Sequence, residues 1–409
     1  MIKRLIYYFM ERRHFWRYIS FSELAELYTS RALRIMALSM ANAFIAIYMY
    51  QNGYSLAFIL FYLAIYCVFR GLAAWPSAHL IGRFGPKSMT MVSNLVYVPA
   101  LLCLSVVPEY GIFAIAVFGL LQGFSSELYE ICYMVDFSKV RHGDHTGKEM
   151  GYMSIVENIA KSVSPLIGGL IAMLFSPQAT IITAAFLFAI AALPLMLSPE
   201  PTRIHQRISF RSMPYKKIWR GGVAFAARGA DILASGVVWS LMVAIMVFGT
   251  AGNVVYMQIG ALASLTILVA VISARVVGLL VDRRRGGLLL QVGVIGNALT
   301  HVSRPFVMTP AGVLTVNVVN EAVSTAYHMP LIQGTFDMAD RLSGFRIAYL
   351  SVMSAASSLG ATLLALAGGL ISLVSTEALT LQSVFIMTAV MSLLIMAHGL
   401  PALGKRRFF

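Results

Sequence analysis

Charged and titratable side chains occur inside stretches that are otherwise apolar enough to cross a lipid bilayer. Ionisable groups are costly in hydrocarbon and are usually functional there, so they are the first candidates for chemistry. Carboxylates in such positions can carry protons, and neighbouring cations can bind anionic groups. The residues of this kind are Arg31, Arg34, Arg70, Glu127, Glu130, Glu157, Lys161, Arg228, Asp231, Arg275, His301, Arg304, Glu321 and His328.

Glu127 and Glu130 are the strongest candidates for proton transfer. Their spacing of three places both on one helix face. Two adjacent acids resist being charged together, so one of them can hold a proton near neutral pH. We expect this pair to lie within reach of Arg31 and Arg34. Arginine contacts that form in one conformation only would then couple proton binding to a conformational change.

A second interpretation stays open for these groups, in which they only neutralise one another between helices. Glu157 and Lys161 are four residues apart and can form such an ion pair. When the second half of the chain is aligned with the first, Arg31 matches Arg228 and Arg34 matches Asp231. An acid thus occupies the position that is equivalent to a cation. The two halves are therefore not electrostatic copies, and an asymmetric cavity suits a solute with distinct ends.

Metal, cofactor and enzyme chemistry are disfavoured by the sequence. His, Cys and carboxylate residues show no spacing typical of a metal site. No Gly-x-x-x-x-Gly-Lys loop for nucleotide phosphates occurs either. An intramembrane enzyme that uses Glu127, Glu130 and His328 as acid and base groups is the alternative from another class. We expect no metal and no cofactor.

The composition indicates that most of this chain lies in a lipid bilayer. Of 409 residues, 59% are hydrophobic and 12% are charged, against about 25% charged in soluble domains. Apolar stretches recur at the length of roughly 20 residues that crosses hydrocarbon. The sequence predicts an all-α polytopic membrane protein with twelve transmembrane helices. The expected spans are 23–50, 54–79, 89–107, 110–136, 149–174, 178–198, 222–249, 252–280, 288–308, 311–337, 342–373 and 377–399.

The basic residues are distributed asymmetrically around these spans. The turns after the odd-numbered spans contain no Lys or Arg, whereas the N-terminal segment, the other turns, the central linker and the tail all do. This distribution predicts that both termini face the cytoplasm. The net charge of +14 is then explained by the membrane lipids that the cytoplasmic face meets. Nucleic acid is not needed as a partner.

The chain also repeats itself. Gly168 and Gly169 precede Leu-Ile, and the same four residues recur 200 positions later at Gly368 and Gly369. We expect two pseudo-symmetric bundles of six helices. The predicted segments are a cytoplasmic amphipathic segment 1–22, bundles 23–198 and 222–399, a basic linker 199–221 and a basic tail 400–409.

The turn after the eighth span reads Gly278-Leu-Leu-Val-Asp282-Arg283-Arg-Arg-Gly286. It resembles the Gly-x-x-x-Asp-Arg-x-Gly-Arg loop of the major facilitator superfamily, whose members share twelve spans in two repeats joined by a central linker. The resemblance covers essentially the whole chain. It implies the fold of that family and a conformational latch at Asp282 and Arg283.

The equivalent turn after the second span keeps part of this loop. Arg83 and Gly85 match, whereas Gly82 occupies the acidic position. The resemblance implies a latch role for Arg83 and Gly85 too, although the missing aspartate weakens it.

The fifth span resembles the antiporter signature of the same family. Gly151, Pro165, Gly168 and Gly169 match, while Ala160 and Ser164 replace two glycines. Small residues allow close approach of helices in lipid. We therefore expect this face to pack tightly, whether it is an antiporter signature or only an ordinary packing surface. The resemblance implies export. In the fourth span Gly119 occupies the arginine position of the family, and this departure puts a proton route through that position in doubt.

Together these patterns predict a secondary transporter of the plasma membrane. It would move a small, amphipathic solute by alternating access, coupled to protons and directed outward, and it would function as a monomer. A lipid or lysolipid translocator of the same fold is the alternative. The predicted cavity and coupling residues are Arg31, Arg34, Glu127, Glu130, Glu157, Lys161, Arg228, Asp231, Glu321 and His328.

Overall fold

A computed structural model describes residues 21–140, 146–197, 206, 208–250, 252–266, 286–342 and 344–400. Within these ranges every regular element is helical. The predictions for Asp282, Arg283 and Arg275 concern positions outside the described residues, as do those for segment 1–20 and for the tail from 401 onward.

In the described part of the first half there are six helical runs. The last of them, α7, continues as a short 3-10 helix, η1. The runs are α2 (Phe21–Gln51), α3 (Leu56–Phe84), α4 (Pro86–Ser105), α5 (Val107–Val140), α6 (Thr146–Leu174), α7 (Pro177–Ala192) and η1 (Leu193–Met196).

The second half follows the same order of runs, with more irregular geometry. Its first run is α8 (Tyr215–Leu233), η2 (Ala234–Val238), α9 (Trp239–Val243) and η3 (Ala244–Phe248), and its second is described as a helix over Val254–Thr266. The others are α11 (Gly286–Ser303) with η4 (Arg304–Phe306), α12 (Pro310–Arg341), α13 (Arg346–Ser372), and α14 (Glu377–Leu393) with η5 (Leu394–Ala397).

Hydroxyl side chains begin four of the helices that follow the short turns. Ser55, Ser176, Thr309 and Thr376 each accept a hydrogen bond from the backbone N–H three residues later. Such N-caps satisfy one of the backbone donors that a helix start leaves without an intrahelical partner. Short turns can therefore connect consecutive helices at this end of the molecule, which we call the short-turn end.

The run that begins with α8 contains two π-helical segments, η2 and η3, whereas its counterpart α2 is continuous. A π-bulge shifts the helix register locally and is frequent at functional sites. Ser235 and Gly236 of η2 line the cavity described below. The irregularity therefore lies where the second half faces that cavity.

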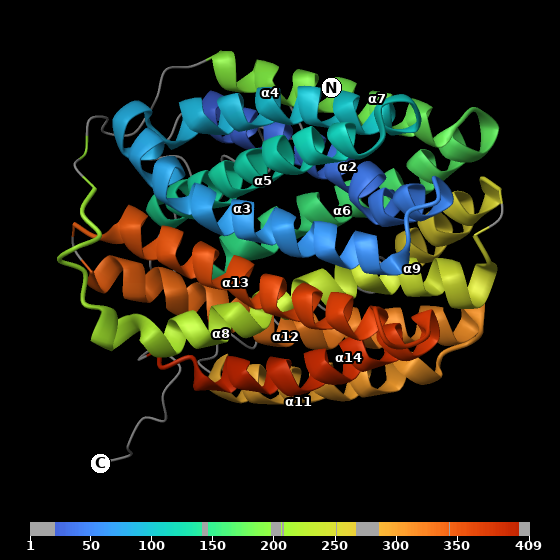
Figure 1. The fold of residues 1–409 in the computed structure, drawn as a ribbon. Helices are drawn as coiled ribbons and strands as arrows, with labels where there is room; N and C mark the ends of the chain where they lie inside the picture. The colour runs from blue at the N-terminus through green and yellow to red at the C-terminus, as the bar shows by residue number, and fades with distance from the viewer. Residues whose placement is uncertain are drawn as a thin grey trace.

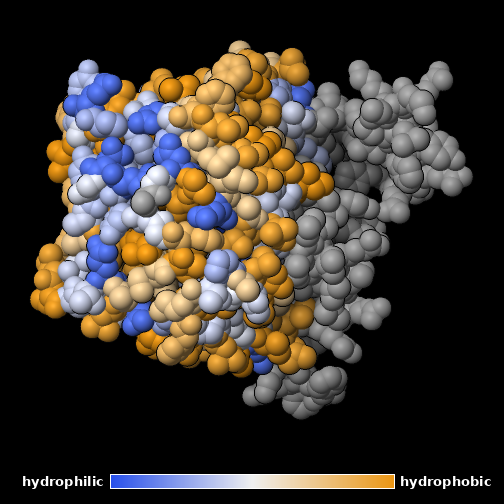
Figure 2. Space-filling model, turned by 90° about the vertical axis from the view of Figure 1, so that its right-hand side faces the viewer, coloured by the Kyte–Doolittle hydropathy of each residue, from blue (hydrophilic) through white to orange (hydrophobic). Residues whose placement is uncertain are grey.

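The helices of the two halves lie roughly parallel, and in Figure 1 those of the first half are above those of the second. Helix α3 packs along α13, and α6 lies between the halves. Hydrophobic residues cover much of the surface that Figure 2 shows, and large side chains such as Leu72, Trp75 and Phe186 are exposed. Such extensive exposed apolar surface marks contact with a nonaqueous environment.

Eight of the described helical runs are long and apolar enough to cross a membrane. The predicted fold class, an all-α polytopic membrane protein, is confirmed.

The start of the second half differs from the prediction. Helix α8 begins at Tyr215, inside the expected linker 199–221. Ile218 is buried while Lys216 and Lys217 stay exposed, so this basic stretch forms an amphipathic helix turn rather than a loop.

Candidate functional site

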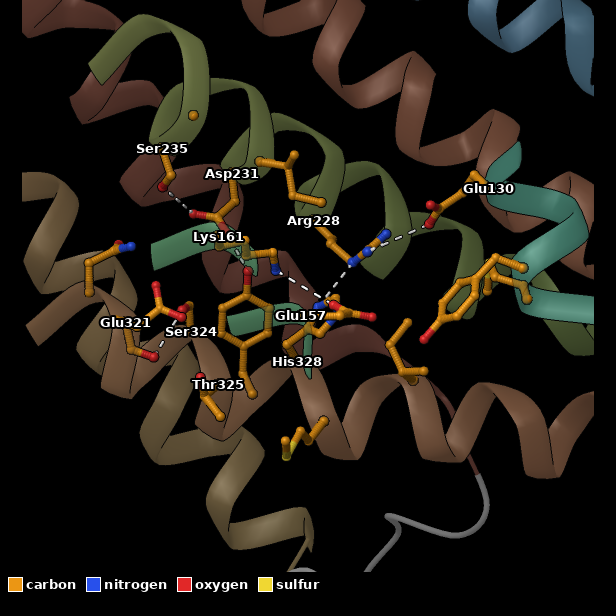
Figure 3. Close-up of a pocket in the computed structure, with 18 of the residues that line it drawn as sticks. Glu130, Glu157, Lys161, Arg228, Asp231, Ser235, Glu321, Ser324, Thr325 and His328 are labelled. Carbon is orange, nitrogen blue, oxygen red and sulfur yellow. Dashed lines mark hydrogen bonds and ion pairs between the residues drawn. The ribbon is translucent and has the colours of Figure 1, made fainter. Parts of the chain in front are cut away.

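A cavity of about 650 Å³ lies between the two halves. Helices α2, α5 and α6 contribute one wall, and α8, η2 and α12 contribute the other (Figure 3). Its acidic, basic and histidine lining residues are Arg31, Glu130, Glu157, Lys161, Arg228, Asp231, Glu321 and His328. Eight of the ten predicted cavity residues thus face one space, and Arg34 and Glu127 do not.

On the first-half wall, two cations share one carboxylate. Arg31 lies 2.6 Å from Glu157, and the Nζ of Lys161 lies 3.6 Å from the other oxygen of Glu157. Arg31 also donates to the hydroxyl of Tyr129 and stacks 3.3 Å from the centre of the Tyr133 ring. These contacts fix the guanidinium, and Glu157 alone cannot neutralise both Arg31 and Lys161.

An ion pair crosses the cavity. Arg228 of α8 lies 4.0 Å from Glu130 of α5, which belongs to the other half. The Nε–H of Arg228 also donates to Nδ1 of His328 at 3.2 Å. An imidazole nitrogen that accepts a hydrogen bond carries no proton, so His328 is neutral in this arrangement.

Asp231 is buried and fully engaged by donors. It accepts hydrogen bonds from Asn297 at 2.9 Å, from His301 Nε2 at 2.6 Å, from the Tyr327 hydroxyl and, at 3.4 Å, from the Ser235 hydroxyl. Arg304 donates to Nδ1 of His301 at 3.0 Å, so His301 is neutral and its Nε2–H points at Asp231. The positive charge of Arg304 therefore balances Asp231 through one imidazole.

Glu321 lines the same cavity from α12. The hydroxyl of Ser324 donates to its backbone carbonyl and not to its carboxylate. Among the described residues, no side chain forms a hydrogen bond or ion pair with this carboxylate.

Glu127 lies elsewhere, which corrects the expectation that it faces Arg31 and Arg34 together with Glu130. It is fully buried and pairs with Arg70 of α3 at 3.0 Å. Residues three apart on a helix point about 60° apart, since each residue turns the helix by about 100°. Because α5 packs between α3 and the cavity, that angle is enough to send the two acids to different neighbours.

Arg34 is also outside the cavity. It is 1% exposed, donates to Asn94 at 2.6 Å and lies 3.7 Å from the centre of the Tyr129 ring. Arg34 is thus held by an amide and an aromatic face and not by a carboxylate.

The described part of the latch-like turns shows a different construction from the family loop. Arg83 is exposed, and Gly85 ends α3 with a positive φ of 87°. At the acidic position, the carbonyl of Gly82 accepts a hydrogen bond of 2.8 Å from the backbone N–H of Gln206. A Cβ at Gly82 would lie 2.8 Å from Ile208, so the linker fills the space that a side chain would need.

A buried ion pair holds the start of α4 in the same region. Lys87 lies 2.9 Å from Glu26 of α2, and both side chains are almost fully buried. No specific pattern in the sequence marks this pair, because Lys87 looks like an ordinary basic residue of a turn between spans.

The small residues of α6 lie at a contact between the halves. A Cβ on Gly169 would be 2.5 Å from the carbonyl oxygen of Tyr256, and one on Gly260 would be 2.2 Å from that of Pro165. Gly168 packs instead on Met40 of α2. Gly151 lies near the start of α6, far from this contact.

The halves are hydrogen-bonded at the short-turn end. The amide of Gln51 donates to the carbonyls of Thr250 and Gly252, each at 2.9 Å, and accepts from the hydroxyl of Tyr256 at 2.6 Å. Gln51 follows the cavity residue Arg31 by 20 positions on α2, which is about 30 Å along a helix. These hydrogen bonds therefore join the two halves between the cavity and the short-turn end, about 30 Å from Arg31.

The family model described as Major Facilitator Superfamily matches residues 27–337, more than half of the chain. None of the curated proteins matches the sequence significantly.

Solved transporter structures share the fold. A variant of the E. coli fucose:proton symporter FucP is 14% identical, with a TM-score of 0.64, and the match covers 92% of this chain and 97% of that one. A POT family transporter in complex with a thioalcohol-conjugated peptide is 11% identical, with a TM-score of 0.65 and coverage of 91% and 94%. A POT family transporter in complex with 5-aminolevulinic acid is 11% identical, with a TM-score of 0.63 and the same coverage.

Proposed function

We infer the finer function from one premise: this chain belongs to the major facilitator superfamily, and it is therefore a secondary membrane transporter and not an enzyme. We propose that it moves a small solute by alternating access and couples this movement to protons. The observation that carries the proposal is the cavity between the halves, which is closed at one end by contacts about 30 Å away. We further propose a monomer in the plasma membrane with both termini in the cytoplasm.

Glu130 is the proposed coupling residue. Its carboxylate lines the cavity, while its partner Arg228 belongs to the opposite half. A movement of the halves changes the distance between these two groups, so the proton affinity of Glu130 depends on conformation. Glu127 stays in the proposal as a second acid, although its pairing with Arg70 is internal to the first half.

Export is the proposed direction. It is supported by the antiporter-like residues of α6, where Pro165 and Gly169 lie in close backbone contact with the second half. Symport is the second candidate, because one similar solved structure is a fucose:proton symporter. Both directions place the solute in the same cavity.

The experiment uses the purified full chain in proteoliposomes. A pool of neutral, anionic, cationic and amphoteric solutes is supplied inside or outside, a pH gradient of either sign is imposed, and the two sides are compared by mass spectrometry. We expect at least one solute to accumulate against its gradient, and Glu130→Gln to exchange that solute without concentrating it. Glu109→Gln, an exposed acid at the start of α5, is the matched control.

Two outcomes would contradict these proposals separately. Uphill accumulation by Glu130→Gln at the wild-type level would remove Glu130 from the coupling mechanism. If no member of the pool moved in either direction with folded wild-type protein, the transport of small solutes would be wrong.

A further inference from the structure

The carboxyl group of Glu321 faces the cavity and, among the described residues, has no hydrogen-bond or ion-pair partner. Buried charges in proteins are normally paired, because an unpaired one keeps its desolvation cost. Ser324 and Thr325 line the cavity beside it. An unsatisfied acid at the wall of a cavity is therefore available to a ligand.

A cation is available at the opposite wall. The Lys161 side chain is 45% exposed, and its nearest acid, Glu157, already receives the shorter contact of 2.6 Å from Arg31. One carboxylate cannot neutralise two cations. Lys161 thus presents positive charge to the cavity while it rests 3.6 Å from Glu157.

The remaining charges of the cavity are balanced. Glu130 faces Arg228, and Asp231 is engaged by Asn297, His301 and Tyr327. After these pairs are set aside, one group of each sign is left, on α6 and on α12.

From this arrangement, and resting on the transport function proposed above, we propose that the solute is a small amphoteric molecule. Its ammonium group binds Glu321, and its carboxylate or other anionic group binds Lys161. Met134, Ile232 and Met329 line the same cavity and can contact an apolar segment between the two charges. The volume of about 650 Å³ falls in the range of small-molecule sites.

Solutes of other charge classes fit this lining less well. A monocation would satisfy Glu321 but add positive charge to a cavity in which Lys161 is already uncompensated. A monoanion would leave the carboxylate of Glu321 without a partner and add a second negative charge near it. A neutral solute compensates neither group.

The test uses ω-amino acids with three, five and seven methylene groups, each also as the methyl ester, which keeps only the cation, and as the N-acetyl form, which keeps only the anion. Binding to the full-length protein is measured by thermal shift, because a ligand stabilises the state that binds it. The variants are Glu321→Gln and Lys161→Gln, with Glu109→Gln and Lys217→Gln as controls at exposed positions.

We expect wild-type protein to prefer the amino acid over both blocked forms by about tenfold or more, since each lost contact is charge-assisted. Glu321→Gln should bind the N-acetyl form as well as the parent, and Lys161→Gln should bind the methyl ester as well as the parent. Equal binding of all three forms by wild-type protein, or variants that weaken all three alike, would overturn the inference. So would binding of no member of the series. Transport of another charge class from the solute pool would then leave the transport proposal intact, whereas a pool with no transported member would contradict both.

Discussion

Glu130 and Arg228 lie 4.0 Å apart on helices of opposite halves, so an ion pair spans the cavity where the two halves face each other. A contact of this kind depends on the relative position of the halves more than on the fold of either one. It can therefore be altered without unfolding the protein, which makes it the first target for mutation.

Charge reversal at this pair should change the distance between the halves. Glu130→Arg places two cations across the cavity, and their repulsion should lengthen spin-label distances between positions 83 and 341, which are exposed and belong to different halves. Adding Arg228→Glu restores opposite charges and should bring the distance back toward the wild-type value. If the double variant showed the same distances as the single one, the pair would not control the separation.

Removal of the charge should affect the thermal stability of the protein differently at two acids of the same cavity. Asp231→Asn replaces an acceptor of four hydrogen bonds with a group that carries its own donors, and should cost about 2–5 kcal/mol. Glu321→Gln removes a carboxylate without a described partner and should leave the thermal midpoint unchanged or raise it. Thermal unfolding of both variants in the same detergent checks this contrast.

Two glycine substitutions should separate conformational equilibrium from folding. In Gly169→Ala the new Cβ would lie 2.5 Å from the backbone of the other half, at Tyr256. Overpacking of about 1–3 kcal/mol would shift a two-state ratio by about 5–150-fold, away from the conformation described here. Spin-label distances between the halves measure this shift.

Gly229→Ala is the comparison. Its Cβ would lie 1.8 Å from the carbonyl oxygen of Ser357, within the second half. The contact is internal to one bundle, so we expect a lower thermal midpoint without a defined second conformation. A clean shift of populations by Gly229→Ala would show that this contact, too, changes during transport.

The linker should be released by a side chain at Gly82. Gly82→Ala would place a Cβ 2.8 Å from Ile208 and 2.9 Å from the carbonyl oxygen of Gln206. The segment around these residues must then move away from α3, and trypsin should cleave at the exposed Arg211 faster than in wild-type protein. Gly222→Ala is the control, because a Cβ there would be 4.0 Å from its nearest neighbour. Equal acceleration of cleavage in both variants would contradict the packing of the linker against Gly82.

Asp282 lies outside the described residues, so its role as a latch stays a prediction. Asp282→Asn should shift the balance between inward-open and outward-open states and slow transport. A change of about 1 kcal/mol moves a two-state ratio about fivefold. Identical spin-label distances across the mouth opposite the short-turn end in the two proteins would leave Asp282 as a topology or folding residue.

The sequence predicts the fold well because its signals are of one kind. Apolar length, the distribution of Lys and Arg and the internal repeat all report on the bilayer and not on particular side-chain contacts. The extent of the linker was the main error, since the basic residues after Tyr215 continue a helix whose apolar residue Ile218 is buried.

The candidate site is less predictable, because charge alone does not say which helix a residue faces. Glu127 and Glu130 look equivalent in the sequence, yet one is paired with Arg70 and the other with Arg228. Asn297 and Tyr327, which hold Asp231, are uncharged. Amides and hydroxyls are common in spans for helix packing, so nothing in their type or spacing marked them as partners of an acid.

The seal at the short-turn end has a consequence for how this protein tolerates mutation. Gln51 donates to the backbone carbonyl of Thr250, and this acceptor is present whatever residue occupies position 250. Substitutions there can accumulate without loss of the hydrogen bond. Gln51 supplies both the donor and the acceptor groups of the seal from one side chain. The neighbouring Tyr50 adds one more contact between the halves, because its hydroxyl donates to Glu377 at 2.9 Å. A mutational scan should therefore find the closure of this end concentrated at these two adjacent positions of the first half, whereas sequence drift at positions 250 and 252 should be a poor guide to whether this end stays closed.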